Sequence, residues 1–134
     1  RKSLKGIKVL LAEDNDLNAE LAAILLEDSE MIVTRAADGQ EVVDLFANHP
    51  AGTYDIILMD IMMPKMDGLQ AAKAIRAMQA ERPDAEEIPI IALSANAFAE
   101  DVQTSLDAGM NGHVSKPLNV AEVAKVIARN LNKS

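Results

Sequence analysis

The chain has 134 residues, enough for one domain that buries its own hydrophobic core. Its net charge of −8, with no basic stripe, argues against a nucleic-acid surface and favours a cation or a basic partner. The absence of cysteine excludes disulfides, thiol chemistry and cysteine-ligated zinc. The sequence contains no apolar run long enough for a membrane span and no signal-peptide core, so we expect no membrane contact by this domain.

The first half of the chain alternates short apolar runs with segments of helical periodicity. Residues 7–12 are nearly all apolar and residues 31–36 (MIVTRA) repeat the strand signal, which predicts two strands. Between them, one face of a predicted helix carries Leu17, Leu21, Ile24 and Leu25. After a turn at Asp38-Gly39, one face of a second helix carries Val42, Val43 and Phe46.

The second half continues the same alternation. The run YDIILMD, residues 54–60, predicts a third strand. In the helix predicted from about Gly68, the residues that face the core are Leu69, Ala72, Ile75 and Met78. The charged segment 79–87 is typical of a solvated loop without chemistry. The remaining predicted elements are a strand at 88–94, a helix at 98–108 and a brief strand at 113–115. The last helix carries Val120, Val123, Ala124, Ile127 and Leu131 at helical spacing.

Alternating strands and helices imply an α/β fold, in which a five-stranded parallel sheet has helices on both faces. Ligands of such sheets bind beyond the carboxyl ends of the strands, so the residues at those ends are candidates for function. The strand ends carry Glu13 and Asp14, then Asp60, then Ser94, then Lys116 and Pro117. The second strand ends in nothing reactive.

The residues at the strand ends suit phosphoryl transfer. Carboxylates that converge repel each other, by up to roughly 4 kcal/mol per pair at ~4 Å and an effective dielectric constant of about 20, so a cation must compensate. All-oxygen ligands favour Mg²⁺. A metal, a lysine, a hydroxyl group and a nucleophilic carboxylate are the components that phosphoryl transfer to an aspartate requires.

Each of these residues also has a plain structural explanation. Asp14 and its neighbours can cap the following helix, Ser94 can form a turn, and Lys116 can be a surface lysine. Asp60 is harder to explain in this way, because a carboxylate that closes an apolar run is costly without a partner. The joint arrangement across four strand ends favours the functional interpretation.

Four segments together resemble the receiver domain of two-component response regulators: LLAEDN (10–15), YDIILMDIMMPKMDG (54–68), IIALSANA (90–97) and AGMNGHVSKP (108–117). The resemblance covers nearly the whole chain and implies a flavodoxin-like sheet of order 2-1-3-4-5. It places the receiver domain at residues 7–131. Residues 1–6 would then be a linker or the edge of a longer chain, and 132–134 a tail.

The resemblance also implies a role for each site residue. Asp60 would accept the phosphoryl group from a phosphohistidine, with Mg²⁺ as the cofactor and no other cofactor bound. The implied metal ligands are Glu13 (through water), Asp14, Asp60 and the backbone carbonyl of Met62. The implied phosphoryl-binding residues are Ser94 and Lys116, with a cis peptide bond before Pro117.

Two positions concern switching and hydrolysis. The family's switch position is usually Tyr or Phe; here His113 either swings inward when Ser94 moves toward the phosphate or is simply a half-buried, satisfied histidine. Met62 stands two residues after the acceptor and binds an attacking water poorly, so we expect slow hydrolysis of the acyl phosphate. Asn96 is a candidate to orient that water.

These features predict a signalling domain that takes phosphate onto Asp60 and changes conformation to relay a signal. We expect the receiver part of a cytoplasmic hybrid sensor histidine kinase, whose parent protein can be membrane-anchored. A stand-alone phosphorelay regulator is the alternative. Expected partners are a histidine kinase or a histidine phosphotransfer domain, and a weak homodimer through residues 98–108, 113–115 and 120–131 is a further expectation.

The isolated domain is not expected to be an enzyme acting on a separate substrate, although it would catalyse its own phosphorylation and dephosphorylation. Toprim-type and haloacid-dehalogenase-type Mg²⁺ enzymes also gather acids at strand ends, but they generally carry an Asp-x-Asp pair. Here Met62 stands where the second aspartate would be, so a phosphohydrolase-like enzyme is the less favoured alternative.

Overall fold

The computed structural model describes residues 4–50, 52–63, 65–94, 103–104, 106–115 and 118–131, and of Ser94, Ser115, Val120 and Leu131 the backbone alone. Its elements are β1 (Lys8–Ala12), α1 (Asp16–Glu27), β2 (Ile32–Ala36), α2 (Gly39–Ala47), β3 (Ile56–Asp60), α3 (Gly68–Arg76), the 3₁₀ helix η1 (Ala77–Ala80), α4 (Asp84–Glu87), β4 (Ile90–Ser94), β5 (Gly112–Ser115) and α6 (Val120–Leu131). All five predicted strands are present. Most of the predicted helix at 98–108 lies outside the described residues.

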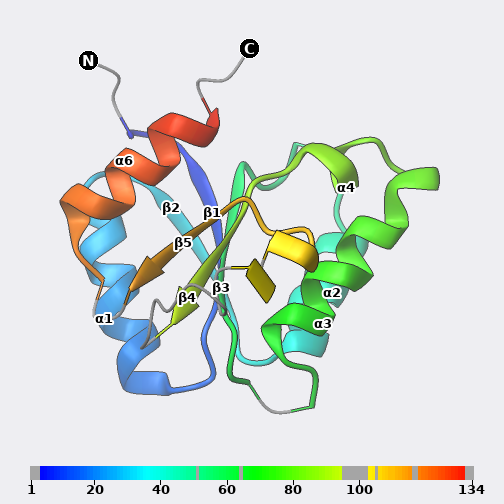
Figure 1. The fold of residues 1–134 in the computed structure, drawn as a ribbon. Coiled ribbons are helices and arrows are strands. Elements are labelled where there is room, and N and C mark those ends of the chain that lie inside the picture. The colour runs from blue at the N-terminus through cyan, green and yellow to red at the C-terminus, as the bar shows by residue number, and fades with distance from the viewer. Residues whose placement is uncertain are drawn as a thin grey trace.

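The sheet has the predicted order, β2-β1-β3-β4-β5, and every pair of neighbouring strands is parallel (Figure 1). β1 and β3 are hydrogen-bonded neighbours, and at the end of their pairing Ala12 lies opposite Met59. The next residues along the chain, Glu13 directly after β1 and Asp60 at the end of β3, therefore lie side by side. This register is what brings the acidic residues of two distant segments to one edge.

Helices cover both faces of the sheet, as the sequence predicts (Figure 1). Along β1, Val9 and Leu11 point to one face, where α1 and α6 pack, whereas Leu10 and Ala12 point to the other, where α2 and α3 pack. Both hydrophobic clusters consist of aliphatic residues and methionine, with Phe46 the one aromatic side chain among their buried members. In the described part of the chain, no helix is both long and apolar enough to cross a bilayer.

Of the four residues predicted on the apolar face of α1, Leu25 packs against the core, but the other three do not. Leu17, Leu21 and Ile24 are 62%, 56% and 59% exposed, and α1 instead buries Ala19, Ala22 and Leu26. Because the helix carries apolar residues on two adjacent faces, periodicity alone does not reveal which of them packs. The small alanines allow a close approach to the strands, which leaves the bulkier row in solvent. We call Leu17, Leu21 and Ile24 the α1 row.

The segment predicted as a solvated loop, 79–87, is mostly exposed, but it contains the short helix α4 and packs on α2 and α3 through a few residues. Ala85 of α4 is fully buried, and the Arg82 guanidinium lies 4.2 Å from the centre of the Phe46 ring. Arg82 also donates to the carbonyl of Phe46 (2.6 Å) and forms an ion pair with Asp84 (2.8 Å). The hydrogen bond from Arg82 lowers the pKa of the Asp84 carboxyl below its ordinary value. The Arg82–Asp84 ion pair therefore belongs to the packed part of this connection, whereas Glu81, Glu86 and Glu87 are exposed as predicted.

Candidate functional site

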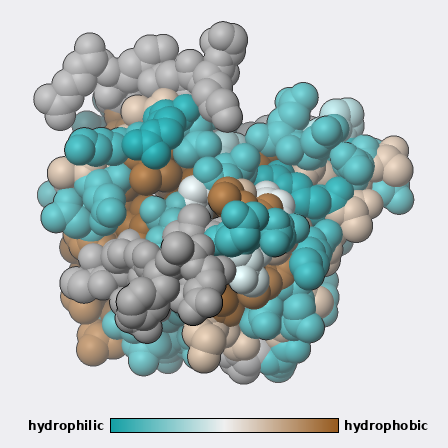
Figure 2. Space-filling view, in the orientation of Figure 1, coloured by the Kyte–Doolittle hydropathy of each residue, from teal (hydrophilic) through white to brown (hydrophobic). Residues whose placement is uncertain are grey.

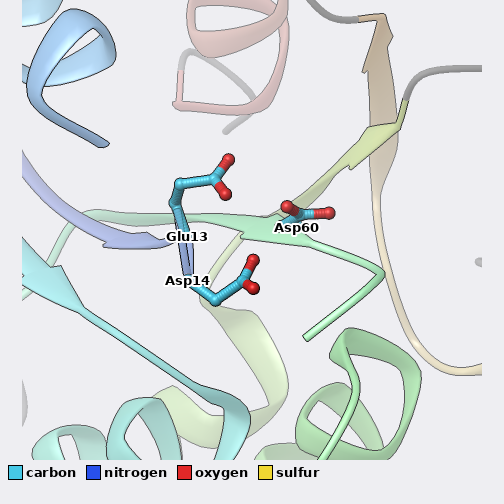
Figure 3. Close-up of side chains that lie close together, drawn as sticks. All are labelled: Glu13, Asp14 and Asp60. Atoms are coloured by element: carbon cyan, nitrogen blue, oxygen red, sulfur yellow. The ribbon is translucent and has the colours of Figure 1, made fainter. Parts of the chain in front are cut away.

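Three carboxylates meet at the carboxyl edge of the sheet. Glu13 and Asp14 follow β1 and Asp60 ends β3, and one oxygen atom from each lies within 4.8 Å of the others (Figure 3). Glu13 is 3% exposed and Asp60 is 4% exposed, whereas Asp14 is exposed at the mouth of the cluster. Among the described residues, Glu13 and Asp60 are the two buried acidic side chains, which makes this edge a centre of concentrated negative charge.

Backbone amides hold the two buried carboxylates. Oε2 of Glu13 accepts from the amide of Asn15 at 3.1 Å, and Oδ1 of Asp60 accepts from the amide of Met62 at 3.1 Å. The N-cap of α1 is Asn15, whose side chain accepts from the amide of Asn18 at 2.9 Å. Asp14 is therefore not the helix cap that its position would also have suited, and its carboxylate faces the cluster (Figure 3).

The loop after Asp60 is held tightly against the end of β3. The amide of Gly68 donates to the carbonyl of Ile61 at 2.8 Å, and Asp67 caps α3 in a reciprocal capping box with Gln70. A Cβ atom at Gly68 would lie 2.3 Å from the carbonyl oxygen of Asp60. Residue 68 must therefore lack a side chain for α3 to begin so close to the candidate acceptor.

We expect Gly68→Ala to destabilise the fold by about 3 kcal/mol, because the added methyl group meets backbone atoms that cannot rotate away. Gly112→Ala is the matched control, since a Cβ there would meet Cδ1 of Ile91 at 3.2 Å, the mobile end of a side chain. Urea unfolding measures both variants. Equal losses of unfolding free energy in the two variants would contradict the assigned role of Gly68.

The other candidate residues are described to different extents. Ser94 ends β4 and pairs with Ser115 in the register, while Lys116, Pro117 and Asn96 lie outside the described residues. His113 on β5 is half-buried, and its Nε2 is buried without a hydrogen-bond partner among the residues that the structure describes. Met62 is 79% exposed beside the acceptor.

The cluster fits a hard divalent cation. Its donors are carboxylate oxygens from three side chains, two of them withdrawn from water, and such a set suits Mg²⁺, which binds through few protein ligands and keeps several waters. A cation also offsets the mutual repulsion of the three charges. The chemistry of the donors is therefore consistent with the cofactor expected from the sequence.

One residue at this edge was missed by the sequence analysis. β2 was expected to end in nothing reactive, yet Arg35 reaches from β2 to the turn that carries Glu13 and Asp14. No local pattern identifies such a residue, because the contact joins positions 21 and 22 residues apart and its acceptors are backbone carbonyls.

The strand order and the acidic cluster define a class: a flavodoxin-like α/β domain with a carboxylate centre suited to a divalent cation. Within this class, the chain belongs to the response regulator receiver domain family, whose family model matches residues 9–128.

Named relatives agree with this assignment. The chain is 39% identical over 122 residues to the hybrid signal transduction histidine kinase I of Dictyostelium discoideum, a match that covers 90% of this chain and 7% of that protein. The chain thus spans a small part of this curated relative. The receiver domain of the Pseudomonas aeruginosa sensor histidine kinase PA1611, solved with a magnesium ion in its active-site cleft, is 36% identical, with a TM-score of 0.83. The match covers 96% of this chain and 99% of that one.

A second solved structure is similar in fold. It is the receiver domain of the Saccharomyces cerevisiae response regulator Ssk1, co-crystallised with the histidine phosphotransfer protein Ypd1, and the match has 28% identity and a TM-score of 0.84. It covers 96% of this chain and 91% of the solved chain.

Proposed function

We propose that this receiver domain accepts a phosphoryl group on Asp60 from a phosphohistidine, in a reaction that depends on Mg²⁺. The observation that carries the proposal is the convergence of Glu13, Asp14 and Asp60 at one edge of a receiver fold. Asp60 is the acceptor because it ends the central strand β3. Glu13, Asp14, Asp60 and the backbone carbonyl of Met62 would hold the metal.

The transfer requires one bond to form and one to break. A carboxylate oxygen of Asp60 attacks phosphorus, the bond from phosphorus to the histidine nitrogen breaks, and the leaving imidazole takes the electron pair and then a proton from solvent. Mg²⁺ supplies charge stabilisation to the phosphoryl oxygens when it is bound. The amide of Met62, which donates to Oδ1 of Asp60, orients the attacking carboxylate.

Residues at the ends of β4 and β5 would complete the site. Lys116 would neutralise the phosphoryl oxygens and the Ser94 hydroxyl would bind one of them. Movement of Ser94 toward the phosphate would open space for His113, whose Nε2 lacks a partner among the described residues and gains by reorienting. Met62 and Asn96 would set the lifetime of the acyl phosphate, and α6 with β5 would carry the signal and any weak homodimer.

The α1 row favours a protein donor. Asp60 is 4% exposed, so a donor histidine must press closely against the rim of the site to reach it. A groove of about 890 Å³ runs along α1 beside the acidic cluster, lined by Glu13, Leu21, Ile24, Leu25 and Leu118. Figure 2 shows hydrophobic surface on the side of the molecule where α1 lies, and exposed apolar surface of this kind marks interaction sites.

Charge around the groove defines the partner further. The exposed acidic residues Asp16, Glu20, Glu27 and Asp28 lie on or directly after α1, around its apolar row. A matching partner surface is apolar at its centre and basic at its rim. We assign this surface to a histidine kinase or a histidine phosphotransfer domain.

We place the domain in the cytoplasm as the receiver part of a hybrid sensor histidine kinase, a role supported by its similarity to the hybrid kinase of D. discoideum. A stand-alone regulator remains the alternative. Within either protein the domain would catalyse only its own phosphorylation and dephosphorylation.

Incubation with acetyl phosphate, a small acyl phosphate donor, tests this function. We expect an intact-mass gain of one phosphate that requires Mg²⁺, disappears on hydroxylamine treatment and maps to Asp60. EDTA abolishes the gain. No gain with Mg²⁺ present, from acetyl phosphate or from a phosphorylated histidine phosphotransfer domain, would overturn the proposal.

Asp14→Asn should weaken Mg²⁺ binding by about tenfold, because the variant lacks one of the few charged ligands available to the ion. Mg²⁺ titration followed by amide chemical shifts measures the affinity. Asp44→Asn, which removes an equal charge from the exposed face of α2, serves as the control and should bind Mg²⁺ as the wild type does. Unchanged affinity in Asp14→Asn would remove Asp14 from the metal site.

A further inference from the structure

Arg35 is bound to the turn that carries two of the three acidic residues. Its Nε and Nη2 donate to the carbonyl of Glu13 at 3.0 and 2.8 Å, and Nη2 also donates to the carbonyl of Asp14 at 3.2 Å. Nη1 forms an ion pair with Oδ1 of Asp16 at 2.9 Å. One half-buried guanidinium thus contacts two of the three residues between β1 and α1, and the first residue of α1.

The position of these carbonyls explains what the contact does. The carbonyls of Glu13 and Asp14 belong to the two peptide planes on either side of the Asp14 Cα atom. Fixing both planes fixes the backbone dihedral angles of Asp14 and hence the direction of its Cβ atom. The exposed carboxylate of Asp14 extends from this Cβ atom into the cluster.

The contact lies where regular sheet hydrogen bonding ends. The amide of Glu13 donates to the carbonyl of Ala36 at 3.0 Å, so the main-chain pairing of β1 with β2 extends as far as this residue. Beyond this amide, β2 binds the turn through the Arg35 side chain and no longer through its backbone. The edge strand β2 therefore contacts not only β1 but also the acidic turn that follows β1.

We propose that Arg35 is a positioning residue for the metal site, which holds the main chain around Asp14 so that its carboxylate and that of Glu13 face Asp60. This inference rests on the proposed function, because it concerns the same site. Arg35 touches neither the phosphoryl group nor the metal. It acts through two backbone carbonyls, and the planar fork of its guanidinium allows both to be bound at once.

A purely structural role gives a different expectation. If Arg35 only fastened the turn to β2, its loss would lower the free energy of unfolding without changing the affinity for Mg²⁺. If it positions the ligands, its loss raises the Mg²⁺ concentration needed for half-saturation, and the rate of phosphorylation recovers as Mg²⁺ is increased. Comparing Mg²⁺ affinity with stability separates the two roles.

The test uses four variants of the 134-residue chain. Arg35→Gln removes the charged fork, Arg35→Lys keeps the charge but lacks the fork, and Asp16→Asn removes only the ion pair. Arg82→Gln is the matched control, because Arg82 is also a half-buried arginine that binds a backbone carbonyl and an aspartate, but at the end of α2 remote from the cluster. Amide chemical shifts report Mg²⁺ binding, urea unfolding reports stability, and acetyl phosphate reports the rate.

We expect Arg35→Gln to raise the half-saturating Mg²⁺ concentration about tenfold and Arg35→Lys about threefold. Asp16→Asn and Arg82→Gln should stay within about twofold of the wild type, although Arg82→Gln unfolds at lower urea concentration. Before Mg²⁺ is added, the amide signals of Asp14 and Asn15 should already shift in Arg35→Gln, since the turn has lost its restraint.

Two outcomes would overturn the inference: an unchanged Mg²⁺ affinity in both Arg35 variants, or an equal loss of affinity in Arg82→Gln. If Arg35→Gln does not fold, Arg35→Lys and Asp16→Asn still decide the question, because equal Mg²⁺ affinities in these two variants contradict a role for the fork. A wild type that binds no Mg²⁺ would instead overturn the proposed function.

Discussion

Asp60→Asn is expected to abolish phosphate incorporation, with a loss of at least about a hundredfold from any donor, because a neutral amide oxygen is a poor nucleophile toward phosphorus. The substitution preserves the size of the side chain, and its Oδ1 can still accept from the amide of Met62. It also removes one of three neighbouring negative charges, and urea unfolding checks that the variant stays folded. Lost labelling can then be assigned to chemistry.

Intact mass after incubation with acetyl phosphate and Mg²⁺ measures this effect, and peptide mapping locates the phosphate. Asp44→Asn is the charge-matched control and should label as the wild type does. Glu13 and Asp14 lie close enough to take a stray label, which is why the site must be mapped. Undiminished, hydroxylamine-labile labelling of Asp60→Asn would show that another carboxylate is the acceptor.

The sequence predicted those residues of the candidate site whose positions follow from the ends of the strands. A parallel sheet brings the carboxyl ends of its strands to one edge, so Glu13, Asp14 and Asp60 were expected to converge once the strands were recognised. Strand order came from the resemblance to a family, and the β1–β3 pairing then placed the acids side by side. The roles of Ser94 and Lys116 stay predictions, since their side chains are not described.

The errors of the sequence analysis concern contacts between side chains and distant partners. The helical period identified α1 but could not show whether Leu21 or Ala22 faces the sheet, because both belong to apolar rows. The charges of 79–87 suggested solvent, although Arg82 packs on a ring 36 residues earlier. Arg35 was missed for the same reason, because its acceptors are main-chain carbonyls, which no sequence pattern identifies.

The misassigned face of α1 leads to the second large expected effect. Replacing Leu21 and Ile24 by serine should slow transfer from a phosphorylated histidine phosphotransfer domain by about 30-fold. Each side chain is a little more than half exposed, and burying this exposed part against a partner contributes about 1 kcal/mol, so losing both costs about 2 kcal/mol. Transfer from acetyl phosphate should stay within about twofold of the wild type, because a small donor covers no surface on α1.

The ratio of the two rates separates docking from chemistry. Ile32→Ser is the matched control: Ile32 is 57% exposed, but it lies at the start of β2, at the opposite edge of the sheet from the acidic cluster. Intact mass measured on reactions stopped at successive times gives the rate with each donor. The donor domain used is one that phosphorylates the wild type. Because Leu21 and Ile24 are more than half exposed, serine there should cost little stability, and urea unfolding measures that cost. Unchanged transfer from the donor domain, an equal slowing with both donors, or an equal slowing in Ile32→Ser would contradict docking on α1.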